Sequence, residues 1–259
     1  MSLPYFELTL MLYFFGAALF AISLAIRTNV LSSLAVGITA FGFELHSAVL
    51  HTLFFGTEHT PLGSLYEVMV FFSWGLVLAF LVAEYIYRIP SLGSFVLPLG
   101  VLSLIFAATV RDDLQVLEPV FSNIWFHVVM TVLGTVAFAL AFVVGIMYLI
   151  QENLLKSKKF IPMYHKLPPL DFLDDLNRKS ILFGFPLLTL GILAGAIWAN
   201  FSSGSYWNWE PKQVLTVVTW FFYLVVLLGR FMVGWRAKRA AYLTIIGFVG
   251  VLATFATIG

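Results

Sequence analysis

Eight apolar runs divide this sequence, and each is long enough to cross the ~30 Å hydrocarbon core of a bilayer. They lie at about 8–26, 30–55, 66–87, 91–109, 124–150, 181–200, 214–233 and 240–258. Only 10% of the residues are charged, against about 25% in a soluble domain, and so apolar a surface would aggregate in water. The sequence therefore predicts an all-α, polytopic membrane bundle of about eight transmembrane helices surrounded by lipid.

The basic residues indicate how these helices are oriented, because Lys and Arg favour cytoplasmic connections. The first, third, fifth and seventh connections hold 12 of the 14 basic residues. The other side holds only Arg111 and Lys212. We therefore expect both termini to face outward. The polar connection 151–180 should be cytoplasmic, with room for a short surface helix, and segment 201–213 should be outward.

The composition also excludes several kinds of site. The chain has no cysteine, which excludes disulfides, thiolate metal sites and a CxxC motif, and means that it cannot itself hold haem through thioether bonds. Its net charge of +1 gives no indication of a nucleic-acid partner. The first 26 residues contain no Lys or Arg, so we expect no cleavable signal peptide.

One outward connection is crowded with aromatic side chains. It reads Ser203-Gly204-Ser205-Tyr206-Trp207-Asn208-Trp209-Glu210-Pro211-Lys212-Gln213. Three large rings in four positions form an apolar platform at the membrane surface. Pro211 is suited to the first turn of the next helix, with Glu210 or Asn208 near its N-terminus. By composition alone, an interfacial aromatic belt would also explain this segment.

The order of these residues resembles the tryptophan-rich signature of the CcsA-type haem-handling proteins of cytochrome c assembly, a family that includes CcmC-like and HemX-like members. That signature runs roughly Trp-Gly-Ser-Tyr-Trp-Ser-Trp-Asp-Pro-Lys-Glu. The matching positions are Gly204, Ser205, Tyr206, Trp207, Trp209, Pro211 and Lys212. A second block, from Gly56 and His59 through Pro61, Ser64 and Tyr66 to Glu67, is similar to the family's Gly-His-x-Pro-x-Ser-Asn-x-Tyr-Glu stretch.

The resemblance implies one CcsA-like domain over 1–259 that binds haem at the outer face. The haem would be b-type and held non-covalently, in a bacterial inner (plasma) membrane or a thylakoid-type membrane. Haem needs an apolar pocket, one or two axial ligands and cations for its propionates. Tyr206, Trp207 and Trp209 would hold the ring, and Lys212 and Arg111 are the outward cations.

Four histidines are candidates for contact with haem. His127 begins the fifth span on the outward side and is the first candidate for an iron ligand. His46 is the second, because an intramembrane histidine is costly and by default functional; a buried histidine bonded to a neighbouring helix is the alternative. His51 lies nearer the interface, and His59 belongs to the second family block. Glu44 shares the span of His46 and is expected to pair with a histidine or a backbone donor.

This sequence also departs from the family pattern. Ser203 replaces the first tryptophan of the signature, and Gln213 replaces its final glutamate. No histidine precedes Arg230, where the family has one. The family's further histidine after the last helix would fall beyond Gly259. A partner would supply these ligands, or the full haem relay has been lost.

Two functions from different classes follow. In the first, the chain is a haem-binding component of system II cytochrome c biogenesis that holds haem for delivery or attachment to apocytochrome c, beside a CcsB-type membrane partner. If active, it belongs to a holocytochrome c synthase complex, and no residue is expected to act as a covalent catalyst. In the second, it is a diverged, non-catalytic membrane subunit or HemX-like regulator. A secondary transporter is less consistent, because no pair of broken helices repeats in the two halves.

The charge distribution makes the topology testable. Single cysteines introduced as Asp112→Cys and Lys158→Cys should react with a membrane-impermeant thiol reagent from opposite sides, position 112 from outside. The chain's lack of native cysteine makes each label unique. Labelling of both positions from outside would contradict the orientation.

Overall fold

The computed structural model of this protein describes residues 3–26, 29–55, 61–110, 124–158 and 162–255. In these ranges the secondary structure is helical, without strands, and eight helices are long and apolar enough to cross a membrane. The all-α, multi-pass fold predicted from the sequence is thereby confirmed. The elements are α1 Leu3–Ala25, α2 Val30–Phe55, α3 Leu65–Tyr87, η1 Pro90–Leu92, α4 Gly93–Thr109, α5 Ile124–Lys156, α6 Pro162–Lys166, α7 Leu170–Ser203, α8 Pro211–Leu228, η2 Gly229–Val233 and α9 Ala237–Phe255.

Helix extends further into the polar connection 151–180 than its composition suggests. α5 continues to Lys156 and α7 begins at Leu170, and the short helix expected between them is α6. Ion pairs one turn apart accompany the added turns: Lys156 with Glu152 at 2.6 Å, and Lys179 with Asp175 at 2.8 Å. Such pairs support helix in polar sequence.

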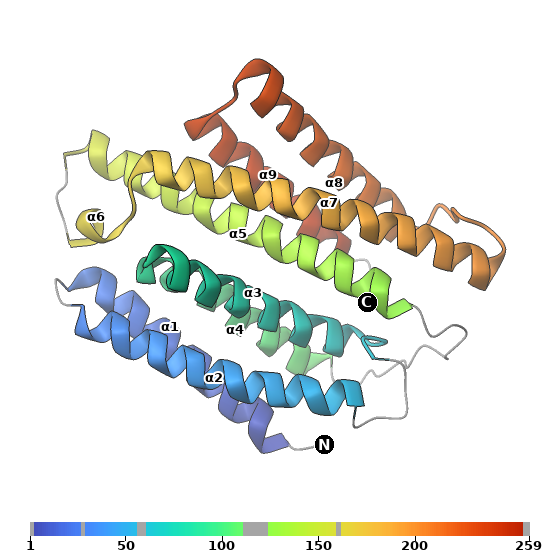
Figure 1. Cartoon of the computed structure of the whole chain (residues 1–259), viewed down its shortest axis with the longest axis horizontal. Coiled ribbons are helices and arrows are strands. Elements are labelled where there is room, and N and C mark those ends of the chain that lie inside the picture. The colour runs from blue at the N-terminus through green and yellow to red at the C-terminus, as the bar shows by residue number, and fades with distance from the viewer. Residues whose placement is uncertain (1–2, 27–28, 56–60, 111–123, 159–161, 256–259) are drawn as a thin grey trace. The chain divides into compact units, whose positions relative to one another are not determined.

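The chain forms two compact units, which are described separately. Unit 1 comprises Met1–Gln115 and Ile150–Leu170, and unit 2 comprises Val116–Leu149 and Asp171–Gly259. Unit 1 therefore contains α1 to α4, drawn in blue and green in Figure 1, and unit 2 contains most of α5 with α7, α8 and α9. The single domain expected from the resemblance stays a prediction.

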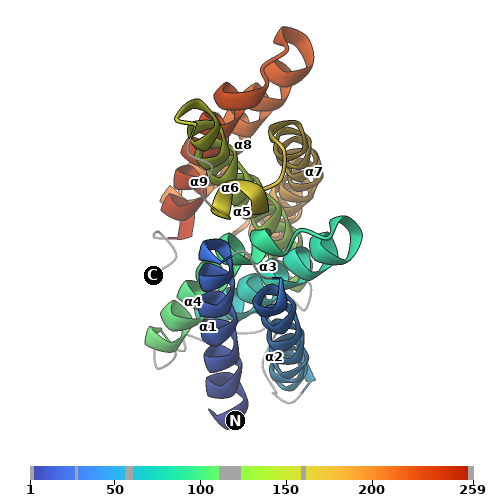
Figure 2. The same ribbon diagram turned by 90° about the vertical axis from the view of Figure 1, so that its left-hand side faces the viewer.

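Unit 1 is a bundle in which α1 packs on α2 and α4, and α3 packs on α2 and α4 (Figure 2). Its core is aromatic: Phe20 and Phe80 are fully buried and pack edge to face, with their ring centroids 5.4 Å apart. Small polar side chains bridge α3 and α4, where Ser73 donates to the Gly100 carbonyl at 3.0 Å and Ser103 to that of Met69 at 2.8 Å. Hydrogen bonds between helices are typical of membrane bundles, where lipid offers polar groups no partner.

The second family block begins α3. Ser64 is the N-cap, and its hydroxyl accepts from the Glu67 amide at 3.3 Å. The Glu67 carboxylate accepts in turn from the Gly63 amide at 3.0 Å. This reciprocal arrangement resembles a capping box, which satisfies the free amides of a helix start. Ser64 and Glu67 therefore have a structural role in this block.

In unit 2, α5 and α7 are in close backbone contact. A side chain at Gly184 would lie 3.0 Å from the Gly134 carbonyl oxygen, and one at Gly191 would lie 2.4 Å from the Thr131 hydroxyl. Small residues let membrane helices approach closely. This closeness places the N-terminal half of α5 beside the C-terminal half of α7, together with the side chains that they carry.

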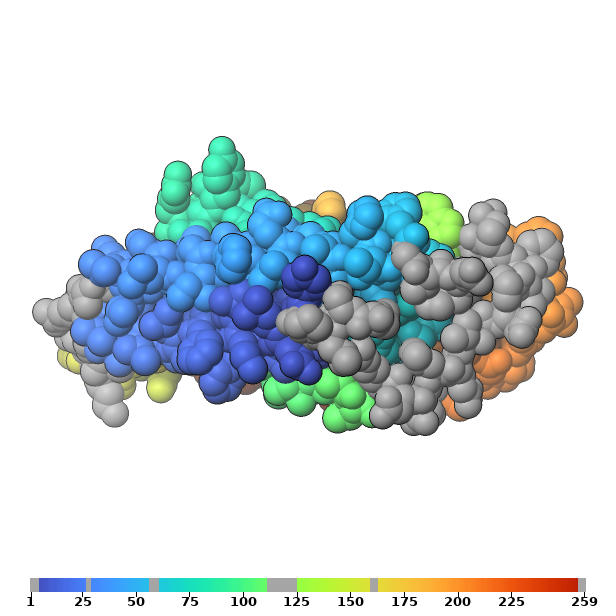
Figure 3. All heavy atoms as spheres, turned by 90° about the horizontal axis from the view of Figure 1, so that it is seen from below, coloured from blue at the N-terminus to red at the C-terminus, as the bar shows by residue number. Residues whose placement is uncertain are grey.

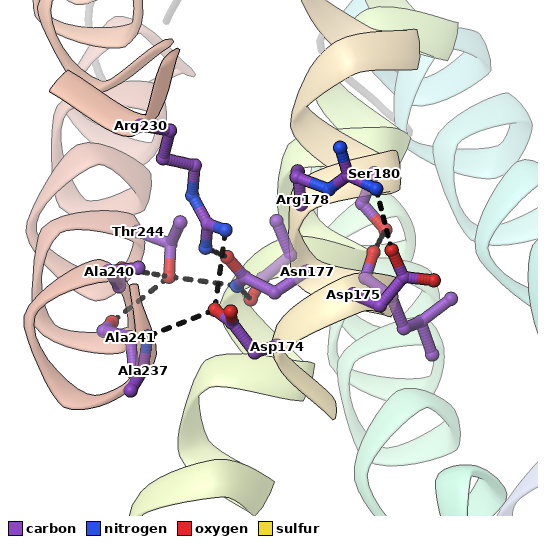
Figure 4. Close-up of polar contacts among 12 residues, drawn as sticks. Asp174, Asp175, Asn177, Arg178, Ser180, Arg230, Ala237, Ala240, Ala241 and Thr244 are labelled. Atoms are coloured by element: carbon purple, nitrogen blue, oxygen red, sulfur yellow. Dashed lines mark hydrogen bonds and ion pairs between the residues drawn. The ribbon is translucent and has the colours of Figure 1, made fainter. Parts of the chain in front are cut away.

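Four helical elements of unit 2, α5, α7, η2 and α9, meet at a buried polar cluster (Figure 4). Arg230, at the π-helical turn η2, donates to the Asp174 carboxylate at 3.2 Å and to the side-chain oxygen of Asn177. Asn177 donates to the Ala141 carbonyl at 2.7 Å and to Thr244 Oγ1 at 3.1 Å. Asp174 also accepts from the Ala237 amide at 3.1 Å, where α9 begins. One network thus ties α5, α7, η2 and α9 together.

Arg230→Met should destabilise the protein. Removing one member of a buried ion pair leaves an uncompensated charge and costs about 3 kcal/mol or more. Arg236→Met is the matched control, because Arg236 is exposed. The measurement is the unfolding midpoint in detergent by intrinsic fluorescence. Equal midpoints for the two variants would show that the cluster contributes nothing.

Candidate functional site

The tryptophan-rich segment lies between two well-defined helix ends in unit 2. Gly204 adopts a positive φ of 73°, and its amide donates to the Asn200 carbonyl at 2.9 Å. This is the left-handed glycine that commonly ends a helix, here α7. Glu210 is the N-cap of α8 and Pro211 its first residue, as predicted from the sequence. The segment is therefore a short loop held at both ends.

Hydrogen bonds within the loop involve the positions that depart from the family signature. The Asn208 side-chain amide donates to Ser203 Oγ at 2.9 Å, and the Asn208 backbone amide donates to Gln213 Oε1 at 3.0 Å. Ser203 replaces a tryptophan, Asn208 a serine and Gln213 a glutamate of the pattern. The three residues form one connected set, which we call the Asn208 clamp. It joins the end of α7 to the start of α8.

The two tryptophans of the loop stand at right angles. Their ring centroids are 5.6 Å apart with an interplanar angle of 88°. Trp207 is half-buried, whereas Trp209 is 78% exposed and Tyr206 is 60% exposed. Trp209 has a φ of +58°, a left-handed conformation that is an outlier for a bulky residue. The loop therefore exposes broad apolar surface on a backbone that includes one strained residue.

His127, on α5, is fixed by α7. Its Nδ1 lies 2.7 Å from the Gly191 carbonyl oxygen, and a side chain at Gly195 would meet the imidazole at 2.7 Å. A carbonyl only accepts, so Nδ1 carries the proton and Nε2 of the neutral ring carries the lone pair. A histidine that donates through one nitrogen to a carbonyl is the usual arrangement of a metal-ligating imidazole. His127 thus has the tautomer and the fixed orientation of a ligand.

Lys212 is the cation of the loop. Its ammonium forms an ion pair with the Glu210 carboxylate at 2.9 Å, with both side chains about half exposed. An exposed ion pair of this kind is weak, so Lys212 is available to another anion. Arg111, the other expected outward cation, lies outside the described residues.

His46 is buried in unit 1. Only 1% of its surface is exposed, and its Nδ1 shares a hydrogen bond with the hydroxyl of Tyr13 in α1, 3.1 Å away. The backbone of Val70 lies against the ring, but Nε2 makes no hydrogen bond in the described part of the chain. The hydrogen bond of Nδ1 to Tyr13 agrees with the expected alternative, a buried histidine bonded to a neighbouring helix. Nε2 has no hydrogen bond in the described part of the chain, so it is the nitrogen that a ligand role would use.

The other histidines differ in their surroundings. His51 is exposed on α2, and the centroid of its ring lies 5.0 Å from that of Phe55. His165 is exposed on α6. His59 falls outside the described residues. Within the described ranges no group of three His, Cys, Asp or Glu side chains that could hold a metal ion occurs.

The missing histidine before Arg230 has a structural counterpart. Gly229 occupies that position, and a side chain there would approach the Trp235 ring to 2.2 Å. The Trp235 amide also donates to the Gly229 carbonyl at 3.0 Å across the π-helical turn. Trp235 therefore fills the space into which a histidine would project, and this arrangement has no room for the family's ligand.

Several contacts of the site were not foreseen from the sequence. Neither the Gly191 carbonyl that orients His127, nor Tyr13 beside His46, nor the Asn208 clamp was predicted. Gly191 and Gly195, four residues apart on one face of α7, were a usable signal, because such spacing marks a close helix–helix contact. The partner of Tyr13 has no sequence signal, since it lies on another helix.

Weakening the Asn208 clamp should loosen the loop. Asn208→Ala removes the bond to Ser203, and Gln213→Ala removes the acceptor of the Asn208 amide. An exposed hydrogen bond contributes about 0.5–1 kcal/mol, so amide exchange in 203–213 should accelerate about two- to fivefold. Hydrogen exchange with mass spectrometry measures this, with Ser202→Ala as control, because Ser202 bonds only within its own helix, to Ala199 at 3.2 Å. Unchanged exchange in both variants would show that the clamp does not hold the loop.

Comparison with known proteins identifies the family of this chain. Residues 62–257 match the family described as cytochrome C assembly protein. A cytochrome c biogenesis protein CcsA of Guillardia theta is 31% identical over 235 residues, which cover 81% of this chain and 78% of that protein. A CcsA of Prochlorococcus marinus (strain MIT 9215) is 32% identical over 222 residues, covering 76% and 72% respectively.

A solved structure shares the fold. A cytochrome c haem lyase, CcmF, superposes with a TM-score of 0.67 over 97% of this chain at 16% identity. This chain spans 45% of that larger protein. At such low identity the match concerns the fold alone. On the family match and the two CcsA relatives, this chain belongs to the cytochrome c assembly protein family.

Proposed function

We propose that this chain is a component of system II cytochrome c biogenesis that holds b-type haem, non-covalently, at the outer membrane face for delivery or attachment to apocytochrome c. The single observation that carries the proposal is His127. Its Nδ1 proton is engaged by the Gly191 carbonyl, which leaves the Nε2 lone pair for iron. The names of its CcsA relatives are consistent with this function.

The aromatic and basic side chains of the loop, which belongs to the same unit as His127, suit a haem. Trp207, Trp209 and Tyr206 supply outward aromatic surface for the macrocycle. Lys212 supplies a cation for a propionate, in exchange for its weak pair with Glu210. His127, Lys212 and the loop belong to the same unit, so one compact body contains the ligand, the platform and the cation.

His46, which lies in unit 1, is also proposed as an iron ligand. Its imidazole is oriented by Tyr13, and when Nδ1–H donates to the Tyr13 hydroxyl, the buried Nε2 keeps its lone pair. Its surroundings are apolar, as haem requires. We give His51 and His59 the lesser role of haem contacts.

The reaction needs little covalent chemistry from this chain. Each apocytochrome thiol adds across a haem vinyl group, so a C–S and a C–H bond form without a leaving group. This chain has no cysteine, and its residues would instead bind and orient the haem. A CcsB-type membrane protein and the apocytochrome are the proposed partners, and the membrane is a bacterial inner membrane or a thylakoid-type membrane with both chain termini outward.

One observation favours the second function, that of a diverged, non-catalytic or HemX-like subunit. Trp235 closes the place of the histidine that the family carries before Arg230. A chain that had left the haem relay would tolerate this change. The two functions differ in a measurable property, because only the first requires bound haem.

Haem content per purified protein distinguishes them. His127→Ala should abolish or sharply reduce bound haem, since a methyl group cannot ligate iron. Trp207→Ala and Trp209→Ala should each weaken binding more than tenfold if each ring buries about 100 Å² against haem at ~25 cal/mol per Å². Lys212→Glu should weaken it by charge repulsion.

Two controls make the result specific. His165→Ala should retain full occupancy, because His165 is exposed on α6. Trp207→Tyr and Trp209→Tyr separate a haem platform from an aromatic belt, which would accept tyrosine without loss. Haem-free wild-type protein, or equal occupancy in all variants at matched yield, would refute haem holding and leave the HemX-like subunit.

A further inference from the structure

Glu44 is a carboxyl group near the middle of a membrane span, and it has no partner in the part of the chain that the structure describes. It lies about 2 Å from the midpoint of α2. It is exposed and makes no hydrogen bond or ion pair in the described part of the chain. The expected pairing with a histidine or a backbone donor is therefore absent from the described contacts. Its side chain is too short to reach the interface, about 15 Å away. Such a group is expensive in lipid and indicates a functional contact.

The same face of α2 contains a glycine that the chain does not need for its own packing. A side chain at Gly37 would meet nothing within 4 Å, whereas one at Gly42, on the buried side, would lie 3.0 Å from the Tyr13 ring. Glycine in a helix costs about 1 kcal/mol relative to alanine. Gly37 lines a shallow groove with Asn29, Val30, Ser33, Leu34 and Ile38. Phe41, 58% exposed, continues this face towards Glu44.

We propose that this face of α2, the Glu44 face, binds a transmembrane helix of another protein that carries a Lys or Arg at the depth of Glu44. Much of α2 is open on the side seen in Figure 3. Close approach at Gly37 and Ser33 is the geometry that membrane helix pairs use. The proposal rests on the proposed function only in expecting a membrane partner.

Charge complementarity identifies the partner's chemistry. None of the 14 Lys and Arg residues of this chain lies in the middle third of a membrane-spanning helix, so the cation must come from another molecule. A second copy does not provide it. Two copies inserted in the same direction place their Glu44 residues at equal depth across a two-fold axis, where like charges would oppose each other.

Site-specific photocrosslinking tests the proposal. The photoreactive residue p-benzoylphenylalanine is placed at Phe41 or, as a matched control, at Phe15 of the full-length chain in the membranes of its own host. Phe15 is 59% exposed near the middle of α1, so the two probes share residue type, depth and exposure. Mass spectrometry identifies the crosslinked peptide.

The expected result is an adduct from Phe41, and not from Phe15, with a transmembrane helix of one other protein that has a Lys or Arg within about one turn of the attachment point. Glu44→Gln and Gly37→Leu, which leave this chain's own packing intact, should each reduce the adduct about three- to twentyfold. Exchanging the charges, with Glu44→Lys here and an acidic residue in the partner, should restore it.

The remaining outcomes overturn the proposal. Three of them are adducts with the wrong helix: one from a second copy, one from this chain itself, or one that lacks a basic residue. The other two are equal adducts from both probes and the absence of any protein adduct. An unchanged adduct in Glu44→Gln at wild-type protein level would remove the carboxyl from the contact. Because the readout is a crosslink and not haem content, its failure is distinguishable from failure of haem holding.

Discussion

Hydrocarbon offers the backbone no hydrogen-bond partner, and this constraint governs the rest of the structure. Each segment that crosses the membrane must satisfy its amides and carbonyls internally, as a helix does. In the part of the chain that the structure describes, eight helices are long and apolar enough to cross a membrane. Irregular backbone at the proposed haem site is confined to the loop that joins α7 to α8, where side chains such as Ser205 satisfy it: its hydroxyl donates to the Trp207 carbonyl at 2.9 Å. The aromatic platform therefore sits at a helix junction and not within a span.

Because hydrocarbon also offers polar side chains no hydrogen-bond partner, the contacts of each polar side chain inside the bundle are informative about its role. His127 is bonded to a carbonyl of α7, and Arg230 is bonded to Asp174 and Asn177. Neighbouring helices partner these groups, so the groups fix helix positions, although the Nε of Arg230 makes no hydrogen bond in the described structure. Glu44 and the Nε2 atom of His46 contrast with them, because neither has such a partner in the described structure. The proposed partners are a helix of another protein for Glu44 and iron for His46.

The departures from the family signature are coupled in space. Ser203, Asn208 and Gln213 form one hydrogen-bonded clamp, and Gly229 is coupled to the ring of Trp235. A tryptophan replaced by serine loses a ring but gains an acceptor for Asn208. The loop thus retains a defined conformation with a different set of contacts. The position before Arg230, Gly229, is closed by the side chain of Trp235, six positions later in the sequence.

Sequence by itself determined the class of fold, because spanning a bilayer requires about twenty apolar residues in a row and such runs are visible without a structure. It also determined the tryptophan-rich loop and the start of α8, since Gly204 and Pro211 are local signals. Tertiary structure alone decided which histidine nitrogen is free, which side of α2 is covered and which departures compensate one another. Those properties depend on contacts such as His127 with Gly191, 64 positions apart, and no local pattern encodes the partner of a side chain on another helix.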